Sequence, residues 1–106
     1  MRIAVTGGSG LAGRCMVRRL AKHHDVINID TLDPGSAGVD LSCVEYSNTD
    51  ILDLDGMVRA LDGAQAVVHA AAIPGPAFGS EIDMDRVNVE GTRNVALAAE
   101  KAGVRR

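Results

Sequence analysis

The segment Thr6–Gly13, with the sequence TGGSGLAG, constrains the fold of this 106-residue chain more than any other feature. It follows Arg2–Thr6, a short apolar and β-branched run of the kind that forms a buried strand. A helical pattern of apolar residues begins directly after it, at Leu11. A glycine-rich turn between a strand and a helix lets an anionic ligand reach the free N–H groups of the first helical turn. The sequence therefore predicts a phosphate site at this turn.

The rest of the chain alternates between strand and helix patterns. Further strands are expected at Val26–Asp30, Val44–Tyr46 and Ala66–Ala72, and helices from Leu11 to about His24, at Asp53–Leu61 and at Asp83–Ala102. Loops are expected at Thr31–Asp40 and Ile73–Ser80, which hold proline and glycine. Strands separated mainly by helices predict an α/β fold with a parallel sheet and helices on both faces. We expect the strand order 3-2-1-4, within a single domain over residues 1–106.

Each residue of the turn has an expected part in holding a pyrophosphate. Gly7 and Gly10 leave the turn free of Cβ atoms, and Gly13 lets the helix pack close to the strand. The hydroxyl of Ser9 is a further donor to a phosphate oxygen. The start of the helix, which includes Leu11 and Ala12, adds its free N–H groups.

An acidic residue completes the pattern at the end of the second strand. Asp30 lies 23 positions after Gly7, where a carboxylate accepts hydrogen bonds from adenosine ribose hydroxyls and repels a 2′-phosphate. This predicts NAD as the cofactor, with NADP disfavoured. A turn with no ligand and a carboxylate that only begins a loop remain the alternatives. Arg14 is the one nearby cation that could reverse the preference, but we expect it to be a solvated helix residue.

Composition excludes other classes of function. The 11 Lys and Arg residues against 14 Asp and Glu give a net charge of −3, and the chain has one Tyr, one Phe and no Trp. This balance argues against nucleic-acid binding, which uses basic patches and aromatic platforms. No apolar run approaches the roughly 20 residues of a membrane span, and no signal peptide is expected. Cys15 and Cys43 suit a reduced, cytoplasmic protein without a metal site.

The sequence resembles the extended short-chain dehydrogenases/reductases, the NAD-dependent epimerase/dehydratase family. The resemblance rests on five motifs in the family's order: Thr6–Gly13, Asp30, Asp50-Ile51, His69-Ala70-Ala71 and Val87–Val95. It implies a Rossmann-type fold in which Asp50 and Ile51 contact adenine and the backbone of His69, Ala70 and Ala71 lies against the cofactor. It also implies that Asn88 lies near the cofactor and holds the central strands, a partly structural role. A catalytic role for His69 is not expected.

The family's catalytic Tyr-x-x-x-Lys pair is missing. Tyr46 is the only tyrosine, and the only lysines are Lys22 and Lys101. The chain resembles the N-terminal third of such an enzyme, so we expect no catalysis from it alone. The resemblance implies a parent oxidoreductase acting on a nucleotide sugar or a similar substrate. A non-enzymatic module that senses NAD is the alternative, and a methyltransferase is disfavoured because Gly13 is present.

The predicted sheet has an exposed edge. In the complete fold of the family, a strand after Gly103 lies beside Ala66–Ala72, and we expect nothing in this chain to take its place. An apolar edge without charges, prolines or bulges invites pairing with another chain. The sequence therefore predicts self-association, through this edge, through the apolar face of Asp83–Ala102 or by exchange of terminal segments. The alternative is that the proline-rich loop or the C-terminal residues fold over the edge and protect it.

Overall fold

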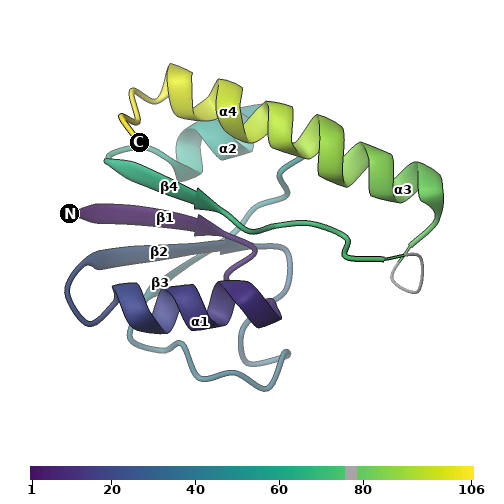
Figure 1. Ribbon diagram of the computed structural model, residues 1–106. Coiled ribbons are helices and arrows are strands. Elements are labelled where there is room, and N and C mark those ends of the chain that lie inside the picture. Colours follow the sequence, from purple (N-terminus) through teal and green to yellow (C-terminus); the bar gives the residue numbers. More distant parts are fainter. Residues whose placement is uncertain (76–78) are drawn as a thin grey trace.

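A computed structural model gives the structure of the protein and describes residues 1–75 and 79–106. Its secondary structure consists of strands and helices that alternate along most of the chain (Figure 1). The strands are β1 (Arg2–Thr6), β2 (Asp25–Asp30), β3 (Glu45–Asn48) and β4 (Ala66–His69). The helices are α1 (Leu11–Leu20), α2 (Leu54–Ala60), α3 (Glu81–Asp85), the π-helix η2 (Arg86–Gly91) and α4 (Thr92–Lys101).

The four strands form one parallel sheet in the order β3-β2-β1-β4, which confirms the predicted fold class and strand order. Helix α1 lies on one face of the sheet, whereas α2 and the long helical segment from α3 to α4 lie on the other (Figure 1). The chain crosses from β1 to β2 over one face and from β3 to β4 over the opposite face. The carboxyl ends of β1 and β4 consequently diverge into loops that leave in different directions.

Side chains that alternate along the strands build a core on each face of the sheet. Ala4, Ile27 and Ile29 point to the α2 and α4 side, where they pack with Met57, Leu61, Val95 and Ala98. Ile3, Val5 and Val26 point to the α1 side, where they pack with Val17, Val39 and Leu41. Two buried faces explain why the sequence of these strands is almost continuously apolar.

Two elements end earlier than expected. The first helix ends at Leu20 and not near His24, because the N–H groups of His23 and His24 both bond the carbonyl of Leu20 and turn the chain. The turn delivers Asp25 to β2, where its N–H bonds the carbonyl of Met1. Pairing of β2 with β1 therefore overrides the helical tendency of this segment.

Strand β4 ends at His69 and not at Ala72. The N–H of Ala70 bonds the carbonyl and the hydroxyl of Thr6, at 3.1 and 3.2 Å. The N–H of Ala71 bonds the same hydroxyl at 3.3 Å. These bonds pull the chain across the end of β1, so the apolar run continues in sequence but leaves the sheet.

The last helical segment begins at Glu81 and is not one regular helix. Ser80 caps α3 through a reciprocal capping box with Asp83, which fixes the helix start. The predicted loop before it, Ile73–Ser80, includes positions 76–78, which lie outside the described residues. A π-helical turn, η2, interrupts the segment at Arg86–Gly91. Single π-helical turns inside α-helices occur often at functional sites.

The outer edge of β4 is partly paired, contrary to the expectation that nothing in the chain covers it. The N–H of Arg105 bonds the carbonyl of Gln65 at 3.3 Å, and the N–H of Val67 bonds the carbonyl of Arg106 at 2.8 Å. Gly103, with φ at +73°, turns the chain back from α4 toward the sheet, as a helix-terminating glycine does. The premise of an open edge is therefore wrong at the start of β4.

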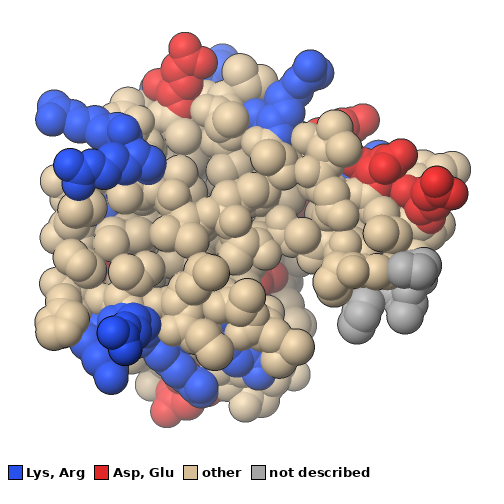
Figure 2. Space-filling model, in the orientation of Figure 1, with Lys and Arg blue, Asp and Glu red and all other residues tan. Residues whose placement is uncertain are grey.

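Basic side chains do not form a continuous strip on the face shown in Figure 2. They gather over α1, near the C-terminus and over α4, with an uncharged surface between the group over α1 and the other two, and acidic side chains lie over α3 and also over α4. Within residues 1–75 and 79–106, no helix has the length and apolar character needed to cross a membrane.

Candidate functional site

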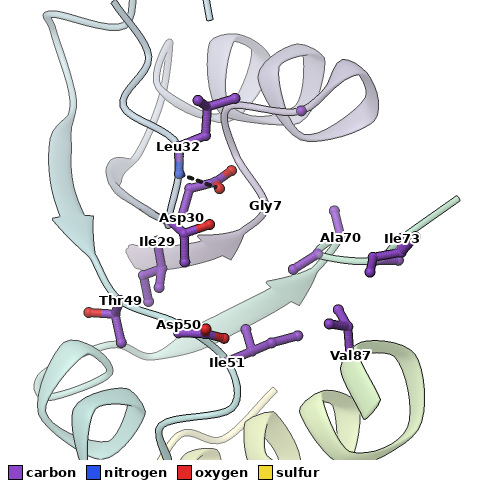
Figure 3. Close-up of a pocket in the computed structure, with 14 residues that line it drawn as sticks. Gly7, Ile29, Asp30, Leu32, Thr49, Asp50, Ile51, Ala70, Ile73 and Val87 are labelled. Atoms are coloured by element: carbon purple, nitrogen blue, oxygen red, sulfur yellow. Dashed lines mark hydrogen bonds between the residues drawn. The ribbon is translucent and has the colours of Figure 1, made fainter. Parts of the chain in front are cut away.

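A cavity of about 370 Å³ lies at the carboxyl ends of β1, β2 and β4 (Figure 3). Ligands of open parallel sheets bind at such a place, where the strand order reverses and two loops diverge. The cavity is lined by Gly7, Gly10, Ile29, Asp30, Thr31, Leu32, Thr49, Asp50, Ile51, Ala70, Ala71, Ala72, Ile73 and Val87. Seven of these are predicted site residues: Gly7, Gly10, Asp30, Asp50, Ile51, Ala70 and Ala71.

Three of the four glycines in the turn are required by the fold itself. Gly7 has φ at +69°, and a Cβ there would lie 2.7 Å from the backbone of Ala71. A Cβ at Gly13 would lie 1.9 Å from the carbonyl oxygen of Gly7, and one at Gly8 would lie 2.2 Å from the Asn28 side chain. The contacts at Gly7 and Gly13 are with backbone atoms, so these two positions must be glycine whether or not a ligand binds, and a side chain at Gly8 would have to displace the buried side chain of Asn28.

Gly10 differs from the other three. Its φ of −74° and ψ of 175° suit any residue. A Cβ there would meet only the carbonyl oxygen of Gly7, at 3.2 Å, a contact that a shift of a few tenths of an ångström relieves. Gly10 lines the cavity, so the fold leaves open the space that its missing side chain would fill.

The start of α1 faces the same turn without a side chain to cap it. Gly10 is the N-cap residue and has no side chain, and the first turn of α1 contains no acidic residue. The N–H groups of Leu11, Ala12 and Gly13 are therefore available to an anion, as at other helix N-termini. The side chains of Leu11 and Ala12 are exposed and do not line the cavity.

Arg14 is fastened to the turn. Its Nη2 donates to the carbonyl of Ser9 at 2.8 Å, and its Nε donates to the carbonyl of Gly10 at 3.1 Å. Arg14 is thus not a solvated helix residue, and its positive charge lies beside the turn.

The carboxylate of Asp30 is held in a fixed orientation toward the cavity. Its Oδ2 accepts the N–H of Ser9 and its Oδ1 accepts the N–H of Leu32, both at 3.0 Å (Figure 3 shows the second bond). A carboxylate has about four acceptor positions, two on each oxygen. Asp30 therefore keeps one free acceptor position on each oxygen, which matches a pair of neighbouring hydroxyl groups.

Ser9 lies inside the protein and not in the cavity. Its side chain is fully buried, and its hydroxyl donates to the carbonyl of Leu32 at 2.7 Å. The same hydroxyl oxygen accepts the Nδ2–H of Asn28 at 3.1 Å. The expectation that this hydroxyl donates to a phosphate is wrong for this structure, because its single hydrogen is already used.

Asp50 and Ile51 form the wall opposite the glycine turn, at the end of β3 (Figure 3). The Asp50 carboxylate accepts the N–H of Leu52 at 2.9 Å, which shapes the turn. The side chain of Ile51 is buried and packs against Gly91, where a Cβ would lie 2.4 Å from its Cδ1. The π-helical turn thus supports this wall, and Ile51 presents an apolar surface on which a flat ring can pack.

Asn88 acts on the cavity through Ile73. Its Oδ1 accepts the N–H of Ile73 at 2.8 Å and its Nδ2 donates to the carbonyl of Ile73 at 3.0 Å. Both polar atoms of a half-buried amide are therefore satisfied by the backbone N–H and C=O of one residue. Asn88 does not line the cavity, but it holds Ile73, which does.

His69 also lies outside the cavity lining and connects β1 to α4. Thr6 Oγ1 accepts two N–H groups, so its own hydrogen is directed to His69 Nδ1, 2.7 Å away. Thr92 donates its hydroxyl to the carbonyl of Asn88 and therefore accepts the Nε2–H of His69, 2.9 Å away. This pattern requires a neutral ring protonated on Nε2. Burial lowers the pKa of His69 and favours the same neutral form.

A family model described as the 3-beta hydroxysteroid dehydrogenase/isomerase family matches residues 4–106. The chain belongs to this family. Its glycine turn, Asp30 and the long helix with Asn88 all lie within the matched residues, and the predicted resemblance to the extended short-chain dehydrogenases/reductases is confirmed.

Three known proteins show how this member of the 3-beta hydroxysteroid dehydrogenase/isomerase family relates to whole enzymes. L-arabinose 1-dehydrogenase (NAD(P)(+)) of Haloferax volcanii is 38% identical over 105 residues, which cover 99% of this chain and 38% of that protein. A short-chain dehydrogenase/reductase superfamily protein of Agrobacterium tumefaciens, solved with bound NAD, is 33% identical with a TM-score of 0.79, over 99% of this chain and 30% of that one. UDP-glucose 4-epimerase of Thermotoga maritima is 28% identical with a TM-score of 0.86, over 98% and 35%.

The chain therefore spans between 30% and 38% of the length of these three proteins.

Sequence reasoning identified half of the residues that line the cavity in this family member. It missed Ile29, Thr31, Leu32, Thr49, Ala72, Ile73 and Val87. Most of these directly precede or follow a predicted site residue, so their positions beside the ends of parallel strands were the available signal. Val87 directly precedes Asn88, whereas Leu32 and Ile73 lie two residues after a predicted site residue.

Proposed function

We propose that this chain binds NAD through the adenosine and pyrophosphate half of the cofactor. The N–H groups at the start of α1, together with Gly7 and Gly10, hold the pyrophosphate. Asp30 accepts hydrogen bonds from the two ribose hydroxyls, one on each of its free acceptor positions. Asp50 and Ile51 border the adenine, and the backbone of Ala70 and Ala71 forms the opposite side.

Gly10 is the observation that carries this proposal. A turn whose glycines served the fold alone would be explained by backbone angles and close contacts at every position, and Gly7, Gly8 and Gly13 are explained in that way. Gly10 has an ordinary backbone conformation with only the Gly7 carbonyl oxygen near the position of its absent Cβ, and it lines the cavity beside an uncapped helix N-terminus. A phosphate that approaches the backbone at this point accounts for both features.

The charge of Asp30 supports NAD over NADP. A 2′-phosphate would replace one of the two hydroxyls that the carboxylate is placed to accept, and it would bring negative charge against negative charge. The positive charge of Arg14 reduces this repulsion, and two of its five N–H donors are engaged by the carbonyls of Ser9 and Gly10.

The activity of a whole protein that contains this chain is a further step. We propose an NAD-dependent oxidoreductase of the epimerase, dehydratase or dehydrogenase type, acting on a nucleotide sugar or a similar substrate; bound NAD supplies its hydride acceptor. The relatives' own names, which include a sugar dehydrogenase and a nucleotide-sugar epimerase, support this class. The acid/base groups of such a reaction are not among the residues of this chain. The free cysteines, Cys15 and Cys43, support a reducing, cytoplasmic setting.

Calorimetric titration of the 106-residue chain with NAD, NADP and ADP-ribose tests the proposal. Wild-type protein is expected to bind NAD and ADP-ribose, because both carry the half of the cofactor that the cavity fits. Gly10→Ala is expected to abolish binding while the circular dichroism spectrum stays unchanged. Gly75→Ala is the matched control, since a Cβ there meets open space and the residue lies outside the cavity lining. Unchanged NAD affinity in Gly10→Ala would refute the proposed phosphate site.

A further inference from the structure

Two fully buried polar side chains lie behind the cavity wall. Asn28 is the only polar residue within the apolar part of β2, and its side chain points to the α1 face together with Val26. Its Nδ2 donates to Ser9 Oγ at 3.1 Å, and Ser9 Oγ donates to the carbonyl of Leu32 at 2.7 Å. A buried hydrogen-bonded chain therefore runs from the centre of β2, through the glycine turn, to the loop that follows β2.

This series of hydrogen bonds forms a closed ring with the carboxylate of Asp30. Ser9 bonds the Asp30 carboxylate through its N–H and bonds Leu32 through its hydroxyl. Leu32 in turn bonds the other carboxylate oxygen through its own N–H. The glycine turn, the carboxylate and the loop are therefore fixed to one another, and Asp30 cannot rotate without breaking two hydrogen bonds.

Asn28 lowers stability in one respect, which makes its position informative. Within the described residues its Oδ1 is fully buried and has no hydrogen-bond partner. This oxygen lies against Gly8, where a Cβ would come within 2.2 Å of it. An unpaired buried oxygen is unfavourable. An apolar side chain would suit position 28 better, because it lies on the same face of β2 as Val26 and packs toward α1. What Asn28 contributes is the bond that holds Ser9.

We propose that Ser9 and Asn28 are positioning residues that hold Asp30 in place and thereby set the preference of the site for NAD over NADP. The inference rests on the proposed function. To admit a 2′-phosphate, the carboxylate must turn away or the loop at Leu32 must move outward. The buried chain opposes both movements. Without it the N–H of residue 9 still reaches Asp30, but the loop is released and the carboxylate can turn with it.

The experiment compares dissociation constants for NAD and NADP in Ser9→Ala, Asn28→Ala and the double variant. The ratio of the NADP constant to the NAD constant is expected to fall about three- to tenfold in each single variant, the effect of one net hydrogen bond. In the double variant this ratio is expected to fall no further than in the single variants, because both substitutions break the same series of hydrogen bonds. Val26→Ala is the control: it lies two residues away on the same strand and face, lowers stability, and should leave the ratio unchanged.

Two results would overturn the inference. The variants could weaken the affinities for NAD and NADP equally, as expected for Val26→Ala, or leave both affinities unchanged. In either case Ser9 and Asn28 serve stability alone, and the proposed NAD site stands. If wild-type protein binds neither NAD nor ADP-ribose, the proposed function fails and the inference fails with it. Should Asn28→Ala not fold, Ser9→Ala decides alone, since it removes one oxygen atom and leaves the backbone bond to Asp30.

Discussion

Replacement of Asp30 by alanine should change both the strength and the choice of cofactor binding. The carboxylate has one free acceptor position on each oxygen, since the other two positions accept the N–H groups of Ser9 and Leu32. Loss of a hydrogen bond to a charged group costs about 1.5–3 kcal/mol. Loss of one of the two ribose bonds should therefore raise the dissociation constant for NAD by about ten- to 150-fold, and loss of both should raise it further.

NADP should respond in the opposite direction. Two unit charges about 4 Å apart near a protein surface repel by about 4 kcal/mol before screening by salt. Asp30→Ala removes this repulsion from the 2′-phosphate and leaves the positive charge of Arg14 beside the turn. NADP should bind to the variant at least as well as to wild type, so the preference for NAD should disappear.

Titration calorimetry with NAD, NADP and ADP-ribose at low and high salt measures both effects. Asp33→Ala is the matched control, because it removes one carboxylate from the same loop but from outside the cavity lining. Higher salt should reduce the gain for NADP and leave the loss for NAD, since only the first is a charge effect. An NAD constant within twofold of wild type in Asp30→Ala would show that this carboxylate does not contact the ribose.

Three further outcomes are expected. Asn88→Ala should lower the free energy of unfolding, measured by chemical denaturation, by about 1–3 kcal/mol, because it removes the partner of both the N–H and the C=O of Ile73. Asn48→Ala is the control and should change this free energy little, because Asn48 is an exposed residue of β3. His69 has its pKa lowered from 6.5, so the stability that its neutral form provides should be complete above that pH and be lost as the pH falls through the lowered pKa; His69→Leu should lack this part of the pH dependence in denaturant titrations. The chain should self-associate through the helical segment from α3 to α4, whose exposed large apolar side chains are Ile82, Val89 and Leu97, and a monomer in sedimentation equilibrium at high concentration would contradict this.

The sequence was sufficient for the parts of the site that depend on backbone pattern. The spacing of the glycines and the position of Asp30 predicted a strand, a turn and a helix N-terminus facing a carboxylate, and the structure brings Gly7, Gly10 and Asp30 to one cavity. Such features are local: each follows from a few neighbouring residues and from the parallel order of the strands.

Features that depend on which way a side chain points could not be predicted. Ser9 is a serine in a turn, where a polar side chain can face either solvent or the protein interior. Only the packing of the turn against β2 shows that its hydroxyl faces inward to Asn28. The end of β4 was missed because AVVHAAA is apolar except for His69, while the hydroxyl of Thr6, more than sixty positions earlier, decides where pairing stops. The π-helical turn had a weak signal: Val87, Gly91 and Val95 follow at two successive steps of four, wider than the 3.6-residue period.

That turn holds one residue more than a regular α-helix needs between the same two ends. Its surplus residue lets Asn88 reach Ile73 while Gly91, three positions later, packs on Ile51. Removing one residue between positions 86 and 91 would restore a regular helix and leave α3 and α4 in nearly the same relative orientation, because the wider π-helical turn absorbs the extra residue. The change would fall on the turn itself: Asn88 and Gly91 could not both keep their contacts, and the walls of the cavity at Ile73 and Ile51 should be disturbed together.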